Sequence, residues 1–334
     1  MTLLLLLIFL LMLHIPRALR CRPLLRSSFT TALNAAIYNS VTLEKGKARL
    51  FQDGNPLIYG GAVKSVEGDP QAGDEVIVKD HNGNVFGRGF YNPFSQYRVR
   101  IMTKSGDSEF RYPIAELIKV RISQSVQLRK AMMLPSSVSN VYRLVNGEGD
   151  RLSGLIIDVL GSTVVVQSSA LWVELNSDHI RESLKDFTES GNKKLIWRRS
   201  ESRLNQDGFA NYTKVALTKE DDTEINTAQT AEIVRENGVR YSVDPLSDQK
   251  TGFYCDQREN RQLIKGICEG KTVLDTYCYT GGFSINAVLG GATEVTAVDS
   301  SRTALSALAA NMELNDISPE LLSIRQGDAV EVKQ

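Results

Sequence analysis

The C-terminal third of the chain alternates short apolar runs with longer amphipathic runs, and this pattern constrains the fold more than any other. Runs at 271–275, 294–299 and 321–325 predict strands, and runs at 283–289 and 302–314 predict helices. This order implies a parallel, doubly wound α/β sheet, because parallel neighbours need a crossover connection. Such a sheet binds its ligand beyond the carboxyl ends of its strands.

An acid stands at the end of each of these predicted strands: Asp275, Asp299 and Asp328. Gly281 and Gly282 precede the first helix. A carboxylate after the second strand is suited to accept hydrogen bonds from both ribose hydroxyls of an adenosine. The pattern therefore predicts a nucleoside cofactor, with Asp299 on the ribose and Asp328 near the adenine amino group. Asp275 would orient the loop or face an ammonium group.

The turn between the first strand and the first helix indicates which nucleoside. A dinucleotide site needs G-x-G-x-x-G, so that pyrophosphate can lie on bare helix N–H groups. Here the turn reads Asp275-Thr276-Tyr277-Cys278-Tyr279-Thr280-Gly281-Gly282-Phe283. Bulky residues at the first glycine positions disfavour NAD. They favour a cofactor without phosphates and with an amino-acid end, S-adenosylmethionine.

The segment from residue 41 to 102 predicts a small β-barrel. Short alternating segments (48–51, 75–78, 97–101) are separated by turn signals, of which Asn82-Gly83 is the clearest hairpin signal. Small barrels often present Lys and Arg to RNA. The segment's net charge is only +1, so composition alone favours scattered surface charge over an RNA-binding rim and does not decide between them. The candidate RNA-binding residues are Lys45, Arg49, Lys64, Arg88, Arg98 and Arg100.

Between the barrel and the C-terminal sheet we expect a small α/β unit. A helix over 113–130 and another over 171–185 accompany strands at 141–145, 154–159, 163–168 and 194–197, and 218–230 reads as an exposed loop. The predicted organisation is a leader (1–40), a barrel (41–112), a central α/β domain (113–230) and the cofactor domain (231–334).

The balanced charge, with 39 basic and 39 acidic residues, hides a basic leader. The leader contains Arg17, Arg20, Arg22 and Arg26 and no acid. Its apolar run 3–13 is too short to span a bilayer. The Arg- and Ser-rich composition favours import into an organelle, while a secretory signal or a later start at Met12 stays open. Four cysteines without a CxxC pair suit a reducing compartment and argue against a metal site.

Two runs of the cofactor domain resemble a known family. They are 275–283, quoted above, and Asp248-Gln-Lys-Thr-Gly-Phe-Tyr-Cys-Asp-Gln-Arg-Glu-Asn-Arg261. They resemble the class I S-adenosylmethionine-dependent methyltransferases that make 5-methylcytosine in bacterial large-subunit ribosomal RNA. The runs 60–63 and 87–100 resemble that family's RNA-binding PUA barrel, and 142–158 resembles its central α/β domain. Asn55 and Leu57 depart from the barrel's usual His and Trp.

The resemblance implies a set of cofactor-binding residues and an RNA partner of ribosomal origin, as the family's substrate is. The segment Tyr279, Thr280, Gly281, Gly282 and Phe283 would line the methionine end of the cofactor, with Gln257 and Arg258 beside it and Ser300 next to Asp299. For Arg258 and Arg261, salt bridges to neighbouring acids on the helix face are an alternative role.

The resemblance also implies a catalytic cysteine, because methylation of cytosine C5 needs a nucleophile at C6. In the family that residue follows later strands of the sheet, so we expect it beyond Gln334 in a longer chain. Cys278 is a weak substitute that reads as a packing residue. The first strand would then be an open edge, which is compatible with a homodimer. A non-catalytic RNA-binding protein is the alternative function.

Overall fold

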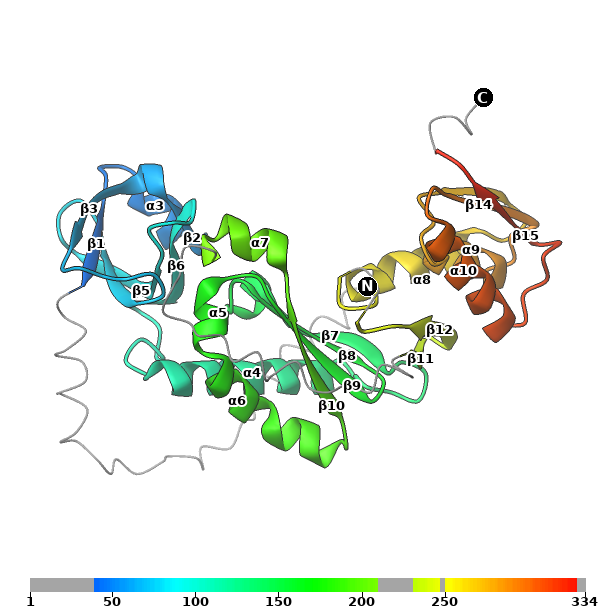
Figure 1. The fold of residues 1–334 in the computed structure, drawn as a ribbon, viewed down its shortest axis with the longest axis horizontal. Helices are drawn as coiled ribbons and strands as arrows, with labels where there is room; N and C mark the ends of the chain where they lie inside the picture. The colour runs from blue at the N-terminus through cyan, green and yellow to red at the C-terminus, as the bar shows by residue number, and fades with distance from the viewer. Residues whose placement is uncertain (1–38, 210–230, 247–249, 329–334) are drawn as a thin grey trace, which may run out of the picture. The chain divides into compact units, whose positions relative to one another are not determined.

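The computed structural model describes residues 39–209, 231–246 and 250–328. Within them, the strands form four sheets of six, four, two and three strands (Figure 1). The predicted α/β fold with an N-terminal barrel-like sheet and a C-terminal parallel sheet is confirmed. The leader and the expected loop 218–230 lie outside the described residues, so localisation stays a prediction.

The six-stranded sheet has the order β2-β6-β5-β4-β1-β3. Its hairpin β4–β5 turns at the predicted Asn82-Gly83, where Gly83 has φ +87° and the Asp80 carboxylate accepts the N–H groups of Asn82 and Asn84. Buried Val41, Leu43 and Phe51 belong to its core. The strands are β1 (Ser40–Leu43), β2 (Leu57–Tyr59), β3 (Val63–Glu67), β4 (Glu75–Lys79), β5 (Val85–Tyr91) and β6 (Tyr97–Lys104).

One predicted strand of this region is wrong. The segment expected as a strand at 48–51 is helix α3 (Ala48–Gln52). Ala48 and Phe51, three residues apart, are buried, while Leu50 is 56% exposed. That spacing fits one helical face, and Ala, Arg and Leu are good helix formers. In a run this short the two periodicities cannot be distinguished from sequence.

The central sheet has the order β10-β9-β8-β7, with β9 and β10 parallel and the other pairs antiparallel. The helix predicted over 171–185 is two helices that meet at Asn176, whose side-chain amide donates to the Trp172 carbonyl. The elements are α4 (Ile114–Ala131), β7 (Val141–Asn146), β8 (Leu155–Leu160), β9 (Thr163–Ser168), α5 (Leu171–Leu175), α6 (Ser177–Ser190), β10 (Lys194–Arg199) and α7 (Glu201–Gln206).

The C-terminal region begins with the hairpin β11 (Glu232–Glu236) and β12 (Val239–Val243), followed by the 3-10 helix η6 (Cys255–Gln257) and helix α8 (Arg258–Ile267). The parallel sheet that follows has the order β13-β14-β15. Its elements are β13 (Thr272–Thr276), α9 (Gly282–Leu289), β14 (Glu294–Asp299), α10 (Arg302–Leu314) and β15 (Leu322–Gln326).

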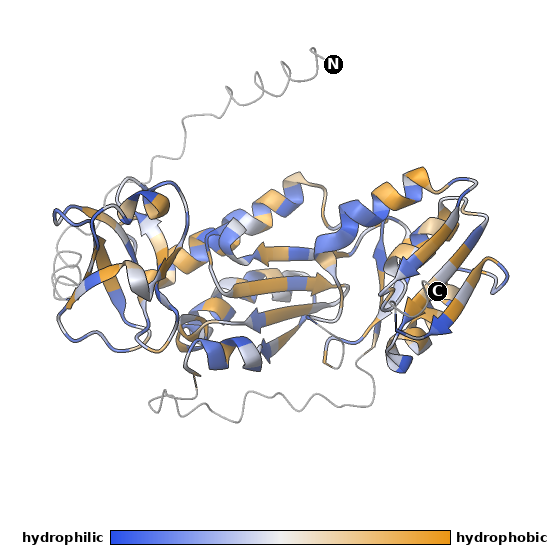
Figure 2. Ribbon diagram, turned by 90° about the horizontal axis from the view of Figure 1, so that it is seen from above, coloured by the Kyte–Doolittle hydropathy of each residue, from blue (hydrophilic) through white to orange (hydrophobic). Residues whose placement is uncertain are grey.

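Apolar residues concentrate on the strands and on the helix faces that pack against them (Figure 2). The C-terminal core contains Val295, Ala297 and Leu308 and also includes Val141 and Leu160 of the central sheet. Among the described strands, β13 is an edge strand, and its Leu274 is 51% exposed. Association through this edge stays a prediction.

Candidate cofactor site

The loop from β13 to α9 has a strained backbone. Tyr277 and Tyr279 have φ values of +64° and +50°, and Gly281, which precedes α9, has φ +84°. A Cβ at Gly281 would lie 1.9 Å from Leu308 Cδ1, so only glycine fits there. Non-glycine residues in this left-handed region cost free energy and persist at ligand sites when their surroundings hold them.

Asp299, at the end of β14, holds this loop. Its Oδ2 accepts the Tyr279 N–H and its Oδ1 accepts the Ser301 N–H, both at 2.9 Å. At the end of β13, Asp275 accepts a 2.5 Å hydrogen bond from the Ser284 hydroxyl, which ties β13 to α9. Burial raises the pKa of Asp275, and the nearby Asp299 carboxylate adds to that shift. The two carboxylates thus fix the turn from both sides.

A cavity of about 410 Å³ opens beside this loop. Its lining combines five aromatic rings from two segments with one carboxylate and several hydroxyl and backbone groups. The lining residues are Lys250, Phe253, Tyr254, Gln257, Arg261, Tyr277, Cys278, Tyr279, Thr280, Gly282, Phe283, Asp299 and Ser301.

The β13–α9 loop forms one wall of the cavity, and residues 250–261 form the second wall. A buried ion pair supports this second wall. Arg261 of α8 donates through Nε and Nη2 to Glu236 of β11, at 2.6 and 2.9 Å, and both side chains are almost fully buried. Nη2 also donates to the Tyr254 carbonyl at 2.8 Å, and the guanidinium lies over the Phe253 ring. Arg261 therefore positions both aromatic residues of this wall.

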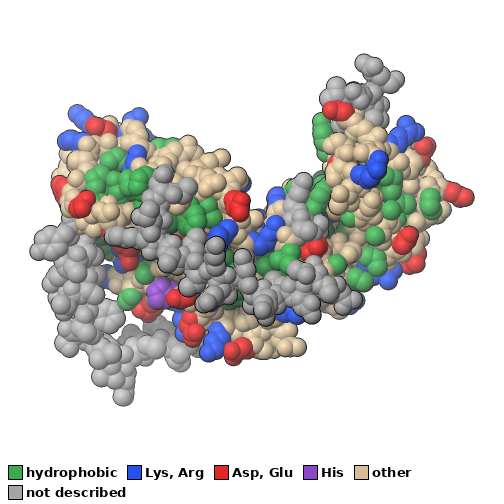
Figure 3. All heavy atoms as spheres, viewed as in Figure 1, with side chains coloured by type: hydrophobic (Ala, Val, Ile, Leu, Met, Phe, Trp, Pro, Cys, Tyr) green, Lys and Arg blue, Asp and Glu red, His purple; other side chains and the backbone are tan. Residues whose placement is uncertain are grey.

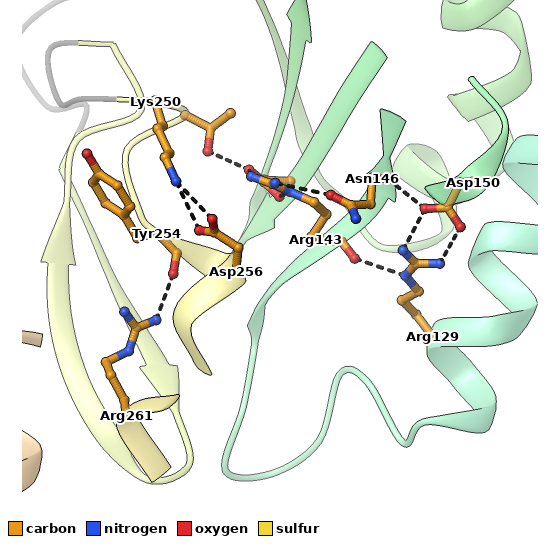
Figure 4. Close-up of polar contacts among 10 residues, drawn as sticks. Arg129, Arg143, Asn146, Asp150, Lys250, Tyr254, Asp256 and Arg261 are labelled. Atoms are coloured by element: carbon orange, nitrogen blue, oxygen red, sulfur yellow. Dashed lines mark hydrogen bonds and ion pairs between the residues drawn. The ribbon is translucent and has the colours of Figure 1, made fainter. Parts of the chain in front are cut away.

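The outer part of the wall is held by Lys250. Its ammonium lies 3.9 Å from the centroid of the Tyr254 ring and 3.0 Å from an Asp256 carboxylate oxygen (Figure 4). Tyr254 in turn meets Tyr279 edge-on, with centroids 5.4 Å apart, so the two walls touch through their aromatic rings. Burial would raise the pKa of Asp256, but the Lys250 ammonium outweighs it and the pKa is lowered.

The structure brings six predicted cofactor residues into this cavity: Gln257, Tyr279, Thr280, Gly282, Phe283 and Asp299. Gly281 and Asp275 support the loop instead of lining the cavity. Ser300 is exposed beside Asp299, and Asp328 is exposed after β15. Arg258 lines a different cavity. Sequence reasoning did not assign Lys250, Phe253 or Tyr254, although all three belong to the 248–261 run that signalled the resemblance.

The arrangement fits a nucleoside that carries no phosphate. Asp299 lies where a ribose would meet the end of β14, and the aromatic rings supply apolar contact for the rest of the molecule. The Phe283 side chain lines the cavity in the first turn of α9, where a dinucleotide site keeps bare N–H groups for pyrophosphate. These residues therefore suit S-adenosylmethionine better than NAD.

The buried thiols near the cavity are protonated at neutral pH. Burial raises the pKa of Cys278 to about 12, with the Asp275 and Asp299 carboxylates contributing. Burial also raises the pKa of Cys255 well above its usual value. Both cysteines, like Cys268, are free and buried. A protonated, buried thiol is a packing group and a poor nucleophile.

The candidate RNA-binding residues of the barrel divide into two groups. Lys45, Arg49 and Lys64 are exposed. Arg88 and Arg100 are each 8% exposed and are bound internally, Arg88 to the Tyr112 carbonyl and Arg100 to Asp207 and Ser153. Arg98 is half-buried and donates to the Pro93 carbonyl. The structure thus leaves only the first group at the surface.

The described surface shows basic and acidic side chains interspersed on the face drawn in Figure 3. Within residues 39–209, 231–246 and 250–328, no cluster of three or more His, Cys, Asp or Glu side chains is arranged to hold a metal. The helices of these same ranges include none that is both long and apolar enough to cross a membrane.

Known proteins that are similar to this chain include S-adenosylmethionine-dependent methyltransferases, in agreement with the cofactor site described above. A profile of the PUA-like domain matches residues 41–104, and a profile of the S-adenosylmethionine-dependent methyltransferase domain matches residues 221–324. Ribosomal RNA large subunit methyltransferase I of Tolumonas auensis is 31% identical over 280 residues, covering 83% of this chain and 67% of the relative. The Escherichia coli protein of that name is 31% identical over 284 residues, with the same coverage.

Solved structures show the same fold. A Streptococcus mutans protein described as an S-adenosylmethionine-dependent methyltransferase matches with a TM-score of 0.69 and 20% identity, covering 88% of this chain and 72% of that one. A methyltransferase structure solved in complex with SAH matches with a TM-score of 0.69, 20% identity and coverage of 88% and 71%.

Proposed function

Since the chain belongs to the ribosomal RNA large subunit methyltransferase I family, we propose that it methylates C5 of a cytosine in large-subunit ribosomal RNA. The chain is an S-adenosylmethionine-dependent methyltransferase, and S-adenosylmethionine is its cofactor. The observation that carries the proposal is the cavity beside the β13–α9 loop, in which a carboxylate at the end of β14 faces a ring of aromatic side chains.

The chain's own residues would bind and orient the cofactor. Asp299 would accept hydrogen bonds from the ribose hydroxyls with the lone pairs that its two backbone donors leave unused. Tyr254, Tyr279 and Phe283 would exclude water from the cavity. The bound cofactor supplies a methyl group on a positively charged sulfur, and aromatic faces attract such a cation.

The acceptor carbon sets a further requirement. C5 of cytosine becomes nucleophilic only when a nucleophile adds to C6, and a thiolate is suited to this step. Cys255, Cys268 and Cys278 are buried, and burial raises the pKa of Cys255 and Cys278. We therefore assign the nucleophile to a residue other than these three cysteines.

The N-terminal barrel would supply part of the RNA contact. Its exposed cations Lys45, Arg49 and Lys64 are available to phosphates, whereas Arg88 and Arg100 stabilise the fold. The Arg49 Nε lies 3.6 Å from an Asp53 carboxylate oxygen, and both side chains are largely exposed. Such a pair contributes little and can be exchanged for a phosphate.

The experiment that tests this function uses methyl-labelled S-adenosylmethionine. The purified full chain is incubated with protein-free large-subunit ribosomal RNA, and the RNA is digested to nucleosides. We expect the label in 5-methylcytidine. Label in any other nucleoside would contradict the assignment of cytosine C5, and unlabelled RNA would contradict the proposal that this chain performs the reaction.

A further inference from the structure

A second cavity, of about 390 Å³, adjoins the cofactor cavity at η6. Tyr254 and Gln257 line the cofactor cavity, whereas the residues between and after them, Cys255, Asp256 and Arg258, line the second one. The rest of its lining comes from the central domain: Leu128, Arg129, Met132, Leu134, Tyr142, Arg143, Asn146, Gly149 and Asp150. One turn of chain thus separates the two cavities.

Two of the three arginines in this lining are committed to internal partners (Figure 4). Arg129 binds both oxygens of Asp150, at 2.8 and 2.7 Å, and the Arg143 carbonyl. Arg143 binds both oxygens of the fully buried Asp158, at 2.9 and 3.1 Å. These bidentate pairs make the two guanidinium groups part of the cavity wall.

The third arginine is held only weakly. Arg258 contacts Glu259 at 2.9 Å, and the Glu259 side chain is 80% exposed. An ion pair with one such solvated partner is worth little and can be replaced by another anion. The acids of the lining are already neutralised, Asp150 by Arg129 and Asp256 by Lys250. Arg258 is therefore suited to bind a phosphate.

Another part of the lining is apolar. Leu128 and Met132, at the end of α4, are 50% and 49% exposed, and Tyr142 and Leu134 are buried beside them. Asn146 adds an amide group to the lining. An apolar surface, an amide and a guanidinium correspond to the face, the edge and the phosphate of a nucleotide.

We propose that this second cavity holds a nucleotide of the RNA strand next to the target base, with its phosphate on Arg258 and its base against Leu128 and Met132. The proposal rests on RNA being the substrate. It also gives Arg258 a role on the RNA side of η6 instead of in the cofactor site.

Hydrogen bonds through Asp158 fix the positions of the two cavities relative to each other. Asp158, which binds Arg143 of the second cavity, also accepts a 2.6 Å hydrogen bond from the buried Thr251 hydroxyl. Thr251 follows Lys250, which lines the cofactor cavity. A strand seated in the second cavity would therefore lie at a fixed position relative to the cofactor.

The test measures binding of a short, fluorescently labelled, cytosine-containing single-stranded RNA to the full chain by anisotropy at several salt concentrations. Arg258→Gln should weaken binding about tenfold and lower the slope of log K against log salt by about one. Met132→Ser should weaken binding several-fold without changing the slope. The affinity for S-adenosylmethionine should stay the same in both variants.

Two matched controls carry the same substitutions outside the cavity. Arg235→Gln removes an exposed arginine of β11, and Met133→Ser alters the neighbouring methionine, which is 78% exposed and does not line the cavity. Both should bind RNA as the wild type does.

The outcomes separate the two proposals. If Arg258→Gln and Met132→Ser match their controls while the wild type binds and methylates RNA, only the second cavity's role is overturned. If Arg258→Gln weakens cofactor binding and leaves RNA binding intact, Arg258 belongs to the cofactor site and the proposal is again wrong. If the wild type does not bind RNA, both the proposed function and the role of the second cavity are overturned.

Discussion

At the scale of single residues, Cys278 shows how position decides chemistry. It lies in the cofactor loop with a side chain that is 4% exposed, and burial raises its pKa to about 12. We expect the native chain to leave Cys278 unmodified by iodoacetamide from about pH 7 to 9, because the thiolate is the reactive form.

Peptide mass spectrometry before and after unfolding in urea measures this directly. The unfolded chain should be alkylated at Cys278, since its pKa then returns to the usual value of about 8.5. Rapid modification in the native state would contradict the buried, protonated assignment and reopen a role for Cys278 as a nucleophile.

At the scale of elements, the cofactor wall depends on the bond between α8 and β11. Glu236→Gln removes the charge that balances Arg261, and breaking a buried pair costs about 3–5 kcal/mol. We expect the free energy of unfolding, measured in urea, to fall by roughly that amount. Cofactor affinity should fall as well, because Arg261 holds the Tyr254 carbonyl.

Glu259→Gln is the matched control on the same helix. It removes the exposed partner of Arg258 and should change the free energy of unfolding by less than about 1 kcal/mol. Equal effects of the two substitutions would show that the buried pair does not organise the wall.

The elements that the sequence predicted well are those with a long, regular pattern. The strands and helices between residues 271 and 326 alternate cleanly, so their order and parallel arrangement followed from periodicity. Segment 48–52 is too short for that, and the helix predicted over 171–185 is divided at Asn176, whose backbone departs from helical values (φ −114°, ψ 23°). Local patterns therefore predict the sheet and miss such details.

The sequence predicted the parts of the candidate site that depend on local position in the chain. It did not predict the parts that depend on partners distant in the sequence. The β13–α9 loop and Asp299 follow from strand ends. The partner of Arg261 lies 25 residues away in β11, whereas the sequence suggested neighbouring acids. Arg88 and Arg100 likewise look like surface cations until tertiary packing buries them.

At the scale of the whole molecule, two cavities share η6, and the central domain contributes most of the second one. The C-terminal core is continuous with residues of the central sheet. The central domain is thus part of the reaction site as we propose it. This role of the central domain requires that the cofactor cavity binds S-adenosylmethionine, as the fold and the relatives indicate.

Isothermal titration of the purified full chain with S-adenosylmethionine tests that central claim most directly. We predict one binding site, no binding of NAD, and affinity at least about tenfold weaker in Asp299→Asn, whose amide would oppose a backbone N–H. Asp316→Asn, at a side chain 89% exposed, should bind as the wild type does. Absence of S-adenosylmethionine binding, or full affinity in Asp299→Asn, would contradict the account.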